Sequence, residues 1–86
     1  MTPIETPKDL KDVWQGGCHI LTIYDPREEG SVTIAANKEG LISLAKLCMF
    51  IAEQDNIKGY HIHLDKYSGL DSESNIGVIL LKKDFG

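Results

Sequence analysis

Apolar and polar residues alternate strictly along residues 60–65, within the segment 60–66. Successive side chains of a β-strand point to opposite faces, so one face of this segment collects the apolar residues Tyr60, Ile62 and Leu64. The residues between them, His61, His63 and Asp65, then form a polar row with neighbours about 7 Å apart. The pattern predicts a strand with one buried face and one exposed polar face.

Three other segments have the composition of strands. Residues 18–24 and 31–36 are rich in β-branched and aromatic residues, and the short connection between them contains Gly30. These features predict an antiparallel hairpin. Residues 76–83 combine an apolar run with a basic end and predict a last strand, in which Gly77 marks a candidate bulge.

A periodicity of about 3.6 residues follows Asn37 and predicts a helix over residues 38–54, with Asn37 as its N-cap. The expected buried stripe comprises Leu41, Leu44, Ala45, Cys48, Ile51 and Ala52. Leu47 and Phe50 fall outside this stripe. We expect the N-terminal arm around Trp14 to cover them, and a dimer or partner contact is the alternative.

The N-terminal arm, residues 1–16, is expected to be irregular with a short helical turn. Leu10, Val13 and Trp14 have i, i+3, i+4 spacing, so one turn of helix would place them on a shared face that fixes the arm to the body. Gly16 and Gly17 then separate the arm from the α+β body, residues 17–86.

The element order β-β-α-β-β predicts a single α+β domain in which one helix packs on one face of a four-stranded sheet. The strand order stays open between an antiparallel 2-1-3-4 sheet and a 1-2-3-4 sheet with a parallel centre. The expected core comprises Ile34, Leu44, Cys48, Ile51, Ile62 and Leu64. The uncovered second face of the sheet would meet solvent, a partner or a second copy, so a homodimer is one expectation.

Composition narrows the class of protein. The 86 residues are 42% hydrophobic and 26% charged, with a formal net charge of −4, which is ordinary for a soluble domain and argues against nucleic acid as a partner. With neither a long apolar run nor a leader pattern, we expect a cytoplasmic protein without membrane contact. Cys18 and Cys48 have no CxxC spacing and are expected to be reduced core residues.

The polar row of His61, His63 and Asp65 has the residue types of a metal site. Its outer members diverge on a straight strand, and the sequence offers no evident fourth ligand, so an exposed polar face is favoured and no cofactor is expected. The serines of residues 68–74 lie outside any GxSxG elbow, and no phosphate-binding glycine motif is present. We therefore expect no enzyme activity.

Three motifs carry a family resemblance: residues 37–41 at the start of the helix, residues 59–65, and residues 68–70 before the last strand. Over residues 31–82 the chain resembles the immunity protein 32 family of bacterial polymorphic toxin systems. The resemblance implies a small α+β protein, encoded beside a toxin, that binds and neutralises this toxin without catalysis. The matching positions are Asn37, Glu39, Gly40, His61, His63, Leu64, Asp65, Ser68, Gly69 and Leu70.

The functional hypothesis is therefore recognition of a protein partner, the cognate toxin, by the polar face of residues 60–66 and the loop that follows. The expected partner-binding residues are His61, His63, Asp65, Tyr67, Ser68 and Asp71. Two alternatives stay open. One is a small metal-binding or hydrolytic domain using the His61, His63 and Asp65 row, and the other is a housekeeping dimer.

Overall fold

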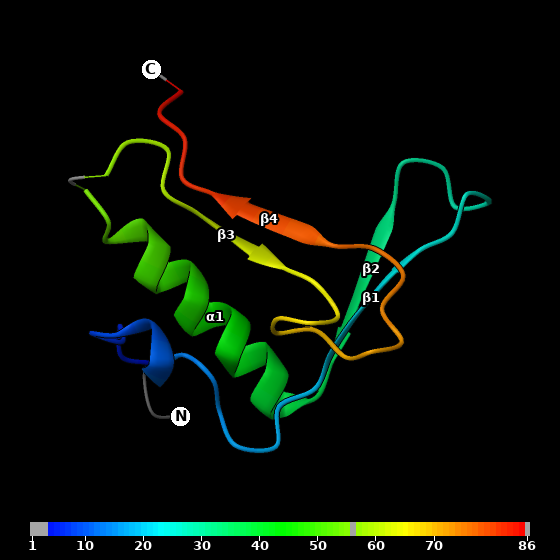
Figure 1. The fold of residues 1–86 in the computed structure, drawn as a ribbon, viewed down its shortest axis with the longest axis horizontal. Coiled ribbons are helices and arrows are strands. Elements are labelled where there is room, and N and C mark those ends of the chain that lie inside the picture. Colours follow the sequence, from blue (N-terminus) through cyan, green and yellow to red (C-terminus); the bar gives the residue numbers. More distant parts are fainter. Residues whose placement is uncertain (1–3, 56, 86) are drawn as a thin grey trace.

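The computed structural model describes residues 4–55 and 57–85. Its elements are a 3-10 helix η1 (Leu10–Asp12), strands β1 (Ile20–Tyr24) and β2 (Val32–Ala36), helix α1 (Lys38–Ala52), and strands β3 (His61–Leu64) and β4 (Val78–Leu81). The predicted α+β class and element order are confirmed (Figure 1). No helix in the described part of the chain is long and apolar enough to cross a membrane.

The strands form two separate antiparallel hairpins rather than one sheet. β1 pairs with β2, with Ile20 opposite Ala36, and β3 pairs with β4, with His61 opposite Leu81. The predicted β1–β2 hairpin is confirmed. The prediction of a single four-stranded sheet is wrong, and neither of the two expected strand orders occurs.

Residues 71–76 keep the two hairpins apart, because they occupy the edge of β1 that a third strand would need. The main-chain N–H of Asp71 donates to the carbonyl of Ile20 at 2.8 Å, and that of Asn75 donates to the carbonyl of Thr22 at 3.1 Å. Ser74 Oγ accepts from the N–H of Thr22 at 3.0 Å. In Figure 1 this segment, drawn in orange before β4, crosses beside β1.

The core lies between α1, the two hairpins and the N-terminal arm. Its buried apolar residues are Val13, Ile20, Leu47, Ile51, Leu64 and Leu70. The expected core positions Ile51 and Leu64 are confirmed, while Leu44 and Ile62 are half-buried and pack against the core. Ile34 and Cys48 are exposed, so their assignment to the core was wrong.

Helix α1 is rotated relative to the predicted stripe. It buries Gly40, Ser43, Leu47 and Ile51, whereas Leu41 is 56% exposed. Ser43 faces inward because its Oγ accepts from the main-chain N–H of Gln15 at 2.9 Å and donates to the carbonyl of Glu39. Gly40 and Ser43 are small residues on the inner face of α1, and they allow the helix backbone to approach the neighbouring chain closely. The pattern of apolar residues alone cannot detect this approach.

The N-terminal arm packs where it was expected to cover the helix. Val13 is fully buried in the same cluster as Leu47, and Trp14 is half-buried against it. Phe50, the other helix residue outside the predicted stripe, contacts Tyr60 edge to face with ring centroids 6.2 Å apart. Leu10 is exposed, so only Val13 and Trp14 of the predicted trio fix the arm.

Candidate functional site

The β3–β4 hairpin separates its side chains into an inner and an outer face. His61 lies opposite Leu81 and His63 lies opposite Ile79, and directly opposed residues of an antiparallel pair share a face. All four side chains are exposed, whereas Leu64 is buried and Ile62 is half-buried on the inner side. We call the surface formed by His61, His63, Ile79 and Leu81 the outer face.

The predicted alternation therefore holds over residues 61–64, whereas Asp65 is half-buried. The two histidines lie side by side. Their ring centroids are 5.0 Å apart with an edge-to-face tilt of 69°. Nδ1 of His61 is 3.0 Å from the carbonyl oxygen of Gly59. When this nitrogen carries the proton and donates it, Nε2 of His61 is left as a hydrogen-bond acceptor for a partner.

The apolar half of the outer face was missed by sequence reasoning. Ile79 and Leu81 are 56% and 54% exposed, in the middle and at the end of the apolar run that predicted β4. Such a run reads as fully buried. The alternation of β3, carried across to β4 by the register of the hairpin, is the signal that could have identified these residues, but the register itself cannot be read from the sequence.

A tight turn follows β3 and holds three of the predicted site residues. The main chains of Asp65 and Ser68 exchange two hydrogen bonds of 3.0 Å, and Asp65 Oδ1 accepts from the N–H of Tyr67 at 2.8 Å. The Asp65 carboxylate thus stabilises the turn. Tyr67 projects from it, 87% exposed, with the ammonium of Lys66 5.3 Å from its ring centroid.

Asp71 lies in a different environment from the outer face. Its N–H binds the carbonyl of Ile20, and its carboxylate is 3.4 Å from Nδ1 of His19. The structure therefore places Asp71 beside the start of β1, where it joins the segment 71–76 to the first hairpin. Of the six predicted site residues, His61 and His63 share the outer face and Tyr67 extends from the neighbouring turn.

The metal alternative needs at least three ligands that converge. Among the described residues, no group of three or more His, Cys, Asp and Glu side chains is arranged to hold a metal ion. Asp65, the third member of the polar row, directs a carboxylate oxygen to the N–H of Tyr67. His61 and His63 thus lie on the exposed face of β3, and Asp65 belongs to the turn that follows.

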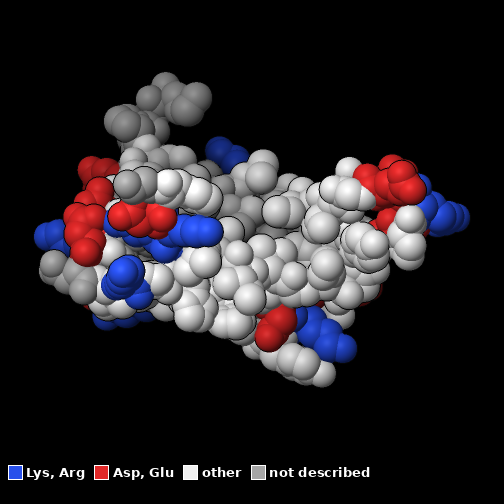
Figure 2. Space-filling model, turned by 90° about the horizontal axis from the view of Figure 1, so that it is seen from above, with Lys and Arg blue, Asp and Glu red and all other residues white. Residues whose placement is uncertain are grey.

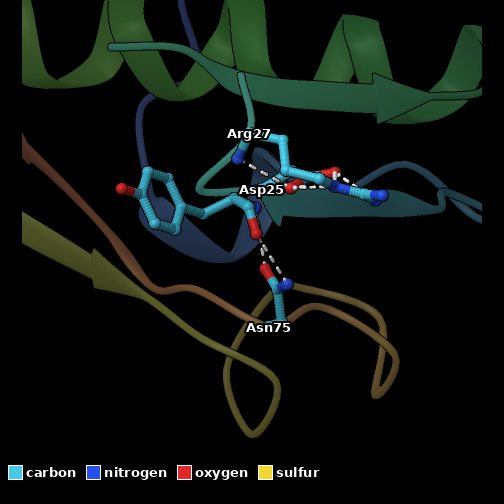
Figure 3. A network of polar contacts seen from close by, with 4 residues as sticks. Asp25, Arg27 and Asn75 are labelled. Carbon is cyan, nitrogen blue, oxygen red and sulfur yellow. Dashed lines mark hydrogen bonds and ion pairs between the residues drawn. The ribbon is translucent and has the colours of Figure 1, made fainter. Parts of the chain in front are cut away.

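The far end of the first hairpin carries a second polar cluster (Figure 3). Arg27 donates to both carboxylate oxygens of Asp25, with an Nη2–Oδ2 distance of 2.8 Å. This side-chain hydrogen bond, together with the one from the Arg27 main chain, lowers the pKa of Asp25. The Asn75 amide spans both main-chain polar groups of Tyr24, accepting from its N–H at 2.8 Å and donating to its carbonyl at 3.0 Å. The hydrogen bonds of Asn75 join the segment 71–76 to the hairpin, and the contacts between Arg27 and Asp25 lie within the loop that follows β1.

Several residues of the family motif have structural roles. Asn37 Oδ1 accepts from the N–H groups of Gly40 and His19 at 2.8 and 3.0 Å, while its Nδ2 donates to the carbonyl of Gly17. Gly69 has a φ of +91°, and a Cβ there would lie 2.9 Å from side-chain atoms of Leu64 and of Trp14. The motif thus maintains both the start of α1 and the turn after β3.

On the face that Figure 2 shows, charged side chains gather at the two ends and at one place along the lower edge, with uncharged side chains between them. No curated protein and no solved structure matches the chain. A comparison with family models matches residues 31–83 to Imm32, described as Immunity protein 32. This segment contains β2, α1, β3 and β4 and all the motif residues named above. The chain belongs to the immunity protein 32 family.

Proposed function

We propose that this protein binds and neutralises a cognate toxin, without catalysis, through the outer face and the turn at residues 65–70. The observation that carries the proposal is the exposure of Ile79 and Leu81 beside His61 and His63. Large apolar side chains next to polar aromatic rings are typical of the centre of a protein interface, where burial of the apolar area supplies affinity and the polar groups supply specificity.

The scaffold supports such a role. The inner face of the same hairpin packs on the core through Leu64, and Lys82 at the end of β4 donates to the carbonyl of Ala52 at 2.8 Å and to Asp55 at 2.7 Å. These contacts fix the hairpin against α1 at both ends. A surface held in this way loses little conformational entropy on binding, which favours tight association.

Tyr67 extends the proposed surface beyond the hairpin. Its side chain is exposed, and the turn itself is fixed by the hydrogen bonds of Asp65. A tyrosine has few rotatable bonds and combines an apolar ring with a hydroxyl group. The net charge of −4 would in addition steer the protein towards a basic surface of the toxin.

Growth rescue in cells tests the proposal. The chain is co-expressed with the toxin domain encoded beside it, as wild type, as Ile79→Lys and as Leu41→Lys. Ile79 and Leu41 are equally exposed, at 56%, and both substitutions change the net charge equally. We expect wild type and Leu41→Lys to restore growth and Ile79→Lys to fail at the same protein level and thermal stability. Rescue by Ile79→Lys equal to wild type would remove the outer face from the interface.

The alternative of a hydrolytic or metal-binding domain makes a different prediction in the same cells. Substitution of both His61 and His63 by Gln would then abolish any activity while the fold is retained. For an interface, we expect the double substitution to weaken rescue in a graded way that higher expression restores, because a binding defect is compensated by concentration.

A further inference from the structure

The most exposed strand in the described part of the chain is β2. Of its five residues, four are exposed and Ala36 is half-buried, and Val32 and Ile34 keep 46% and 49% of their surface in contact with water. On its one paired side β2 meets β1, whose other edge is occupied by residues 71–76. Within the described part of the chain, no hydrogen bond joins the outer edge of β2 to another segment.

The register shows which peptide groups this edge presents. Ile20, Thr22 and Tyr24 of β1 direct their main-chain polar groups to residues 71–76. Because alternate residues of a strand direct their peptide groups to opposite edges, Leu21 and Ile23 bond to their β2 partners Ala35 and Thr33. The N–H and C=O groups of the remaining β2 residues, Val32, Ile34 and Ala36, therefore point away from β1.

The edge lacks the features that prevent strand association. Residues 31–37 contain no charged residue and no proline, and the structure gives the strand no bulge in its pairing with β1. Natural proteins protect such an edge with lysine, proline, a bulge or a covering segment. An unprotected apolar edge is suited to pair with another strand.

We propose that a second copy of this chain pairs with this edge, so that two β2 strands lie antiparallel across a two-fold axis. The edge is self-complementary: with Ile34 opposite Ile34 of the second copy, Val32 of each copy lies opposite Ala36 of the other. All three outward-pointing residues then meet outward-pointing residues. The β1–β2 hairpins of the two copies become one four-stranded antiparallel sheet. The exposed side chains of Val32 and Ile34 then pack beside those of the second copy.

The charges flanking β2 favour the antiparallel arrangement. Glu28 and Glu29 precede the strand, and Lys38 follows it as the first residue of α1. Figure 2 shows acidic side chains together with a basic one at the tip of this hairpin, which points away from the core in Figure 1, and Asp25, Glu28 and Glu29 outnumber Arg27 there. Antiparallel pairing keeps the two acidic tips at opposite ends of the new sheet and places each of them next to Lys38, Glu39 and the positive end of the helix dipole of the other copy, whereas parallel pairing would bring the two acidic tips together.

Sedimentation measures the mass of the particle that the full chain forms at concentrations from one to several hundred micromolar. Amide hydrogen exchange is followed at the same concentrations. We expect dimers at the upper concentrations. Exchange at Val32 and Ile34 should slow as the protein concentration rises, whereas exchange at Thr33 and Ala35, which bond to β1, should not depend on concentration. This alternation by single residues distinguishes edge pairing from association through side chains.

Two variants complete the test. Ile34→Pro removes an N–H that bonds to nothing within the monomer, so it should leave circular dichroism unchanged and shift the dimer to monomer. Ile34→Thr keeps this N–H and a β-branched side chain, and it should remain dimeric. A monomeric wild type at all concentrations overturns the proposal, as does a dimer that persists in a folded Ile34→Pro variant, because copies would then associate elsewhere. If Ile34→Pro does not fold, the exchange pattern of the wild type decides alone.

Discussion

Asn37 and Gly40 hold together the point where the start of α1 crosses the entry to β1. Asn37 accepts or donates in three hydrogen bonds that reach Gly17, His19 and Gly40. A Cβ at residue 40 would overlap the carbonyl oxygen of His19 and lie 3.0 Å from the Cβ of Ala36. Only glycine fits there, because the obstacle is main chain and cannot rotate away.

Gly40→Ala should therefore destabilise the protein by about 1–3 kcal/mol, the usual cost of inserting atoms into a packed site. The sign is informative, since the same substitution in an exposed helix stabilises by up to about 1 kcal/mol. Urea unfolding followed by circular dichroism measures the difference. Gly16→Ala is the matched control, because a Cβ there meets no atom within 4 Å. An unchanged or higher stability of Gly40→Ala would mean that α1 and β1 do not approach so closely.

The ion pair of Asp25 and Arg27 makes a prediction about pH. The Arg27 side chain, followed by its main-chain N–H, lowers the pKa of Asp25 in the folded protein below the unfolded value. The pair therefore stabilises the hairpin above the ordinary Asp pKa, and this contribution is lost as the pH falls through the lowered pKa. Arg27→Gln should raise the pKa of Asp25 towards its ordinary value in a carboxyl NMR titration. An identical titration curve in both proteins would show that the pair does not form in solution.

At the scale of elements, the orientation of α1 gives a direct prediction. Leu47 is fully buried, while Leu41 is 56% exposed on the same helix. Leu47→Ala should cost about 2–5 kcal/mol, because it leaves a cavity between the helix and Val13. Leu41→Ala should change the free energy of unfolding by no more than about 0.5 kcal/mol, as is usual for a surface position. Equal losses would favour the orientation expected from apolar periodicity.

The elements themselves were predictable, but their packing was only partly so. Alternation and helical periodicity identified four strands and one helix with the correct order, and Asn37 was correctly predicted as the N-cap. The four-stranded sheet failed because Ser74 and Asn75 satisfy the edge of β1 with side-chain hydrogen bonds, in a loop without a strand pattern. The helix phase failed because small residues, rather than apolar ones, mark the closest approach.

Only the β3 half of the candidate surface could be predicted from the sequence, because the β4 half depends on how the strands pack. The alternation of residues 60–66 correctly placed His61 and His63 on an exposed face. Ile79 and Leu81 belong to this face only because of the β3–β4 register, which depends on a loop whose geometry the sequence does not specify. Asp65 and Asp71, in contrast, have partners within the protein that tie them to the turn and to β1.

At the scale of the whole molecule, the two proposed surfaces lie on different hairpins. The outer face belongs to β3–β4, and the free edge belongs to β2. Pairing of two copies through β2 therefore leaves both outer faces available, and Ile34→Pro should not reduce toxin binding per chain. Toxin binding and self-association can thus be tested with separate substitutions.

The most direct test is a calorimetric titration of the purified chain with a catalytically inactive form of the toxin domain encoded beside it. We expect wild type and Leu41→Lys to bind with Kd values that agree within about twofold, and Ile79→Lys to bind at least about 30-fold more weakly, since loss of a central interface residue costs about 2 kcal/mol or more. Binding by Ile79→Lys as tight as by wild type, or no binding by wild type, would contradict the assignment of the outer face as the toxin-binding surface.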